Sequence, residues 1–99
     1  MKKEERQTEA VEVGARLARA RRALGMTQVE LAGRLNVEVG NLSNWENGYA
    51  MLPPEYAPQI FMFTRIDSNY LYRDDPSGLP GKLQDKLYGK PPKKTGRRA

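Results

Sequence analysis

Apolar residues recur at helical spacing in the first quarter of the chain. They stand at i, i+4, i+7 and i+11, and they are Val13, Leu17, Ala20 and Leu24. Side chains at these intervals share one face of a helix. Gly25 follows at once, and glycine is the residue at which helices most often end. The pattern therefore predicts an amphipathic helix up to Gly25. The charged segment 1–9 before it is either frayed or a weak extension of that helix.

A second helix is predicted to begin directly after Thr27. Thr27 and Glu30 have the S/T-x-x-E spacing of a capping box, in which the two residues satisfy each other's free backbone N–H groups. The apolar positions after this cap form one stripe at helical spacing: Leu31, Ala32 and Leu35. We expect this helix to bury that stripe and to end near Leu35.

A third helix is predicted after a tight turn, with its end at Gly48. Its buried seam is narrow, because only Leu42 and Trp45 recur at helical spacing, and we interpret Trp45 as a core residue. The remaining positions leave one face for solvent or a partner: Val39, Gly40, Asn41, Ser43, Asn44 and Asn47. Two short helices joined by a tight turn are typical of a helix-turn-helix, which places its second helix in the major groove of DNA.

Three further short helices are predicted in the second half of the chain. Glycine and proline make residues 47–56 a loop and residues 74–78 a turn. The expected helices cover about 57–65, 67–72 and 79–88, with proline tolerated in a first turn and Asp67 as a cap. The predicted fold is all-α: a compact bundle of about five short helices, with an extra short C-terminal helix and flexible termini.

Residues 60–63 are four consecutive apolar residues. On a helix their side chains point in directions that span about 300°, so the core on one side of the helix cannot bury all of them. Either the last two helices close over them or a second subunit does. The candidate dimer interface combines Phe61, Met62 and Phe63 with the apolar stripe of the last helix, which consists of Leu79, Leu83 and Leu87.

Composition limits the classes of function. A chain of 99 residues with 7 prolines holds one small domain of about 60–75 residues. Histidine and cysteine are absent, which removes the common general base, disulfides and the usual zinc ligands. We expect no enzyme activity, no cofactor and no metal, and we interpret the Asp74-Asp75 pair as a loop cap. With no membrane-length apolar run and no visible signal peptide, the expected location is the cytoplasm.

The net charge of +5 is carried by the end of the chain. Residues 89–99 contain five cations and no acid, so the rest is formally neutral: the cations are Lys90, Lys93, Lys94, Arg97 and Arg98. This segment is either a solvated, disordered tail or a contact for polyanions. The expected organisation is a flexible N-terminus (1–9), a helix-turn-helix domain (10–73), a loop with a C-terminal helix (74–88) and a basic disordered tail (89–99).

A set of residues from Val13 to about Tyr72 stands at one family's spacing. The set comprises Val13-Gly14, Leu17, Ala20-Arg21, Leu24–Gln28, Leu31-Ala32, Leu35, Val37, Trp45–Gly48 and Ile66–Leu71. Through them the chain resembles the Cro/repressor (Xre-like) helix-turn-helix family of phage and bacterial transcription regulators. The segment Asp74–Pro80 is also similar to the residues directly after this domain in some prophage regulators. The resemblance implies a lambda-repressor-like bundle, recognition of a double-stranded DNA operator and a two-fold homodimer.

The resemblance also implies roles for single residues. It assigns Gln28 to a phosphate and places Val39, Gly40 and Asn44 opposite base edges. An asparagine amide suits adenine, valine suits the thymine methyl group, and glycine permits close approach of the backbone. Further phosphate or sugar contacts are implied for Asn41, Ser43 and Asn47. Arg21 and Glu46 match a pair that is structural in the family.

Two departures from the family reduce the positive charge expected at the DNA. Glu38 stands where a serine or threonine cap is usual, and Tyr49-Ala50 stand where lysine or arginine is common; no cation lies between Val39 and Gly48. We therefore expect weak binding per monomer that depends on the tail, on dimerisation and on four arginines: Arg16, Arg19, Arg22 and Arg34. The leading hypothesis is a sequence-specific transcription regulator. The alternative is a protein-interaction module on the same fold, such as an antitoxin or an adaptor.

Overall fold

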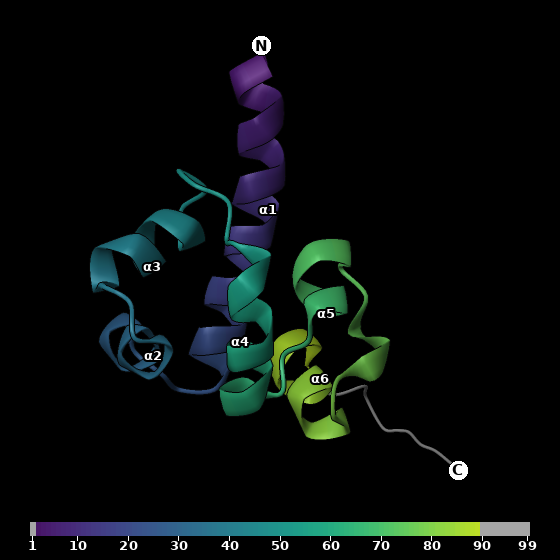
Figure 1. The fold of residues 1–99 in the computed structure, drawn as a ribbon. Helices are drawn as coiled ribbons and strands as arrows, with labels where there is room; N and C mark the ends of the chain where they lie inside the picture. Colours follow the sequence, from purple (N-terminus) through teal and green to yellow (C-terminus); the bar gives the residue numbers. More distant parts are fainter. Residues whose placement is uncertain (1, 90–99) are drawn as a thin grey trace.

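The computed structural model describes residues 2–89, and within this range it is helical without a strand (Figure 1). The elements are α1 (Lys2–Ala23), α2 (Gln28–Leu35), α3 (Val39–Glu46), the 3-10 turn η1 (Pro54–Tyr56), α4 (Ala57–Thr64), α5 (Ser68–Arg73), the 3-10 turn η2 (Pro76–Gly78) and α6 (Gly81–Tyr88). The all-α prediction is confirmed. Of the two alternatives for the segment before Ala10, the structure has the helical extension, because α1 begins at Lys2.

The predicted helix ends rest on the residues that the sequence indicated. Thr27 Oγ1 accepts a hydrogen bond from the Glu30 backbone N–H at 3.0 Å, and the Thr27 N–H donates to Glu30 Oε1 at 2.8 Å. Asp67 accepts from the Tyr70 N–H at 2.9 Å at the start of α5. After α3, Gly48 has φ +81°, a left-handed conformation that glycine adopts without strain. Local chemistry therefore sets where these short helices begin and end.

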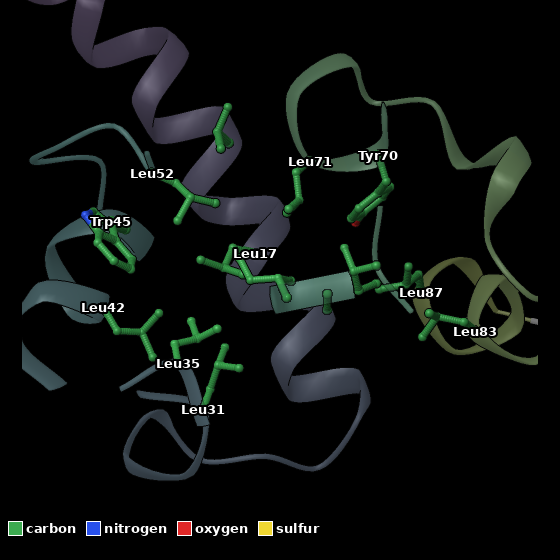
Figure 2. Packing of buried hydrophobic residues seen from close by; sticks show 14 of the residues in the cluster. Leu17, Leu31, Leu35, Leu42, Trp45, Leu52, Tyr70, Leu71, Leu83 and Leu87 are labelled. Carbon is green, nitrogen blue, oxygen red and sulfur yellow. The ribbon is translucent and has the colours of Figure 1, made fainter. Parts of the chain in front are cut away.

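Helix α1 runs through the middle of the molecule (Figure 1). It contacts α3 on one side and α5 and α6 on the other, while α4 packs against α2 and α5. Leu17 of α1 lies at the centre of the core, with leucines of α2 and α3 to one side and Tyr70 and the α6 leucines to the other (Figure 2). Helices of eight residues are marginal by themselves, so burial of their apolar faces here stabilises them.

Gly14 is the point of closest approach between α1 and α3. A Cβ atom at this position would collide with the backbone carbonyl oxygens of Trp45 and Glu46. Only glycine lets the two helices cross at this distance. The crossing holds the end of α3 against α1 and leaves the opposite face of α3 pointing outward.

The structure corrects half of the expected dimer interface. Leu79, Leu83 and Leu87 are buried in the core of the same chain, where α6 packs on α1. The amphipathic stripe of α6 is therefore satisfied within one subunit. On α4 only Ile60 of the four apolar residues is fully buried. Phe61, Met62 and Phe63 stay 41%, 70% and 40% exposed, so the last helices do not close over them.

Candidate nucleic-acid interface

The turn between α2 and α3 fixes the direction of α3. Asn36 ends α2 in the left-handed conformation, with φ 60°, and its N–H bonds back to the last turn of α2. The Val37 N–H donates to the carbonyl of Ala32 at 3.0 Å, and the Val37 side chain packs partly buried against the core. The turn is thus held from both sides, by the backbone and by an apolar anchor. It carries α3 away from α2 as a second, separately oriented helix.

Helix α3 separates sharply into two faces. Leu42, Trp45 and Glu46 are buried against the rest of the domain. The opposite side carries the residues expected at a DNA surface: Val39, Gly40, Asn41, Asn44 and Asn47 are exposed, and Ser43 is partly buried. Gly40, Asn44 and Asn47 recur at i, i+4 and i+7, so they form the stripe that points furthest from the core. The structure brings the whole predicted set onto one surface.

The three asparagines of this surface differ in what their amide groups do. Asn47 Nδ2 donates to the backbone oxygen of Ser43 at 2.9 Å and to its Oγ at 3.2 Å. The side-chain amides of Asn41 and Asn44 make no hydrogen bond to the described side chains, which are those of residues 8–89, or to the described backbone. The side-chain amide N–H of Asn47 is therefore already bonded to Ser43. The side-chain amides of Asn44 and Asn41 keep both their N–H donor and their oxygen acceptor available for a partner.

Gly40 has no packing reason to be glycine. A Cβ atom there would meet nothing within 4 Å, and Gly40 is not among the residues with positive φ. Glycine in a helix costs up to about 1 kcal/mol relative to alanine. The fold gains nothing in return for this cost. What the missing side chain supplies is open access to the backbone of the first turn of α3.

Glu46 joins α1, α2 and α3 in one buried network. Arg21 Nε donates to Glu46 Oε2 at 2.7 Å, and a second guanidinium N–H donates to Oε1 at 3.1 Å. Another donates to the Met26 carbonyl at 2.8 Å. Gln28 Nε2 also donates to Glu46 Oε1, at 2.8 Å. The pair that the family resemblance implied is present, and it includes Gln28. The family resemblance implied that Gln28 contacts a phosphate. In the structure, one N–H of its side-chain amide already donates to Glu46.

The arginines expected to serve phosphates are mostly engaged elsewhere. Arg16 Nε donates to the Leu71 carbonyl at 2.9 Å. Arg19 donates to the Leu87 carbonyl and lies over the Tyr88 ring, 4.7 Å from its centroid. Both therefore face α5 and α6 and not α3. Arg34 lies over the ring of Phe63 on α4, at 5.8 Å. Of the four, Arg22 is exposed and has no contact of this kind within the described residues.

The helix-turn-helix also exposes apolar side chains, on α2 and directly after α3, to which the sequence pattern assigned no role in binding. Val29, in the first turn of α2, is 69% exposed, and Tyr49, just after α3, is 78% exposed. Val29 falls outside the buried stripe of its helix, which is the sequence signal that marks it as outward-facing. Glu38, at the start of α3, makes no side-chain cap. The outward side of α3 is therefore uncharged, and the residue before its first turn, Glu38, is acidic.

Metal-ligand clusters and membrane-length helices are absent from the described range. Among the described side chains, those of residues 8–89, no group of three histidine, cysteine or acidic residues gathers in a way that would hold a metal ion. No described helix combines the length and the apolarity that crossing a bilayer requires.

Asp75 accepts a hydrogen bond from the Ser77 N–H at 3.0 Å. Hydrogen bonding by Ser77 lowers the pKa of the Asp75 carboxyl. This acid caps the η2 turn.

In this helical bundle α2 and α3 are two short helices joined by a tight turn. That arrangement defines the class of helix-turn-helix DNA-binding proteins. A family model described as helix-turn-helix matches residues 17–71, more than half of the chain. The chain belongs to this family, in its Cro/Xre-like form, and the resemblance seen in the sequence is confirmed. A search of curated proteins and a search of solved structures found no match.

Proposed function

We propose that the chain is a sequence-specific transcription regulator that binds a two-fold operator in double-stranded DNA through α3. The observation that carries this proposal is the outward stripe of α3, where Gly40 leaves the backbone open and Asn44 holds an amide with no partner in the described chain. Such an amide can pair with base edges in the major groove. We propose no catalytic role and no cofactor, and an intracellular location, where the DNA is.

A dimer supplies the affinity that one subunit lacks. With few base-reading side chains and no cation on α3, a single copy binds weakly, whereas two copies on one duplex add their free energies. The exposed α4 patch, defined as Phe61, Met62 and Phe63, is the surface proposed for the contact. A closed two-fold pair presents its two α3 helices to half-sites about 34 Å apart, one turn of the double helix.

A second candidate function follows from the exposed apolar residues around α3. Val29, Val39 and Tyr49 are exposed and α3 carries no cation, and such a surface also fits a protein partner. In that case the chain is an interaction module, such as an antitoxin or an adaptor, and α3 does not read DNA.

Selection of bound fragments from random double-stranded DNA separates the two candidates. The regulator yields one enriched palindromic site, on which Asn44→Ala costs about 1–3 kcal/mol and relaxes the preference at one base pair. Gln28→Ala is the matched variant, because it weakens all sites similarly without changing the preferred bases. Failure to enrich any site favours the interaction module. An enriched site on which Asn44→Ala changes neither affinity nor preference overturns the assignment of α3.

A further inference from the structure

The outward face of α3 has a chemistry that matches one kind of base pair. Its side chains without a hydrogen bond in the described chain include the amide of Asn44 and the aliphatic group of Val39, which is 43% exposed. In the major groove an adenine offers an N6–H donor and an N7 acceptor, which an asparagine amide meets with both of its atoms. A thymine offers a methyl group, which an aliphatic side chain meets by apolar contact. Both features belong to A·T pairs.

The same face lacks the side chains that read guanine. Guanine offers two acceptors, O6 and N7, and its usual partner is the bidentate fork of arginine or the ammonium of lysine. No arginine or lysine occurs between Val39 and Gly48. The nearest cation before this segment, Arg34, lies over the Phe63 ring, and the nearest one after it, Arg65, lies over the Phe61 ring. Within the described residues, no cation replaces them on α3.

We infer that α3 reads A·T pairs and does not read guanine. The inference rests on the proposed DNA-binding function and specifies its substrate. Asn44 accepts from adenine N6–H with its oxygen and donates to N7 with its nitrogen, while Val39 packs on a thymine methyl. The two residues are five apart, so they are separated by about 7.5 Å along the helix and contact different base pairs.

Gly40 fits this way of reading. Asparagine is a short side chain, so its amide reaches a base edge only when the helix backbone lies close to the groove floor. Gly40 precedes Asn44 by one turn on the same outward stripe, and the space where its Cβ would lie is empty of protein atoms. The absent side chain removes the group that would first meet the DNA. The missing side chain at Gly40 would let α3 approach the DNA closely, and the short side chain of Asn44 requires such a close approach to reach a base.

Modified operators test the inference one atom group at a time. The full-length protein first selects its site from random DNA. In that site each thymine is then replaced by uracil, which removes only the methyl group, and each adenine by 7-deazaadenine, which removes N7. One uracil substitution is expected to weaken binding about fourfold, as the loss of one buried methyl group does. One 7-deazaadenine substitution is expected to weaken it about tenfold, as the loss of half a bidentate contact does.

Variants of α3 assign each effect to its residue. In Val39→Ala the uracil penalty disappears and the 7-deazaadenine penalty remains. Asn44→Gln keeps the preference for adenine, since glutamine pairs with the same two atoms, whereas Asn44→Arg moves the preference at that position to guanine. These side chains are exposed, and neither has a hydrogen bond within residues 2–89, so the melting temperatures of all three variants are expected to match that of the wild type.

The outcomes distinguish failure of the inference from failure of the proposed function. A selected site whose α3 contacts are G·C pairs overturns the reading of A·T while leaving a DNA-binding regulator. Penalties that persist unchanged in Val39→Ala and Asn44→Arg overturn the assignment to these two residues. If no site is selected at all, the proposed function fails, and the inference fails with it.

Discussion

Arg21 donates to both carboxylate oxygens of Glu46, at 2.7 and 3.1 Å, from positions where the two side chains are only 10% and 3% exposed. The contact connects α1 to the last turn of α3 in the interior of the protein. Because Gln28 donates to the same carboxylate, the start of α2 is held by it as well. The orientation of the proposed reading helix therefore depends on a buried charge pair.

Removal of one partner is expected to destabilise the fold. Glu46→Ala leaves a buried guanidinium without its counterion and is expected to lower the free energy of unfolding by about 3 kcal/mol. Urea denaturation measures the loss. The double variant Arg21→Met/Glu46→Leu removes both charges and is expected to be more stable than Glu46→Ala. An unchanged denaturation midpoint in Glu46→Ala would remove the structural role of the pair.

Substitution of Gly40 is expected to separate stability from binding. Gly40→Ala raises the free energy of unfolding by about 0.5–1 kcal/mol, because alanine has the higher helix propensity. The added methyl group holds α3 away from the bases and weakens operator binding several-fold. Gly33→Ala is the matched control, since Gly33 is an exposed helical glycine at which a Cβ atom would also meet nothing within 4 Å. It gains similar stability with no change in binding. Equal operator affinities for the two variants would show that Gly40 plays no part in DNA contact.

Two tyrosines of α5 are expected to respond differently to removal of their hydroxyl groups. Tyr72 donates to the Leu52 carbonyl at 2.7 Å, so Tyr72→Phe loses a hydrogen bond and about 1 kcal/mol of stability. The buried Tyr70 hydroxyl makes no hydrogen bond of ordinary geometry in the described chain. Burial is the main cause that raises the pKa of Tyr70, the nearby Tyr88 hydroxyl on α6 contributes to raising it, and burial raises the pKa of Tyr72 as well. Tyr70→Phe is expected to leave stability unchanged or to increase it by up to about 1 kcal/mol. Thermal melts compare the pair; a marked loss in Tyr70→Phe would mean that its hydroxyl does have a partner.

The α4 patch is expected to hold the dimer together. Light scattering at micromolar concentration should give twice the monomer mass for the wild type. Met62→Asp should give the monomer mass and remain folded, because Met62 is largely exposed within one chain. Val29→Asp introduces the same charge on α2 and should remain dimeric. Operator half-sites centred about 10 base pairs apart would agree with this pair, and a dimer that survives Met62→Asp would exclude the patch.

The basic segment is expected to add affinity without specificity. Each phosphate that a cation neutralises steepens the log–log dependence of binding on salt by about 0.9. Removal of residues 90–99, which lie outside the described range, takes away five cations. The shortened chain should therefore show a shallower salt dependence and select the same site. Identical slopes would indicate a solvated tail.

Sequence predicted best what short-range chemistry decides. The capping box at Thr27 and Glu30 and the stop at Gly48 depend on neighbouring residues, and the structure has each of them in place. The apolar spacing on α6 predicted correctly that Leu83 is buried, but it did not predict what covers it. Helical periodicity indicates that a side chain is covered and does not indicate whether the same chain or a second subunit covers it. Arg16 and Arg19 show a second limit. Their carbonyl acceptors lie 55 and 68 residues further along the chain, and no local pattern carries that information.

The lack of positive charge on α3 bears on how such a protein would find its operator. A regulator with many cations at its DNA-binding surface binds any phosphate backbone. Most of its molecules are therefore bound to unrelated genomic DNA, along which they slide. A folded domain that is formally neutral, with amide and methyl groups at its reading surface, would leave unrelated DNA quickly. Its occupancy would then depend on how well the bases fit and on the number of free molecules, and any retention between encounters would come from the basic segment 90–99 and not from α3.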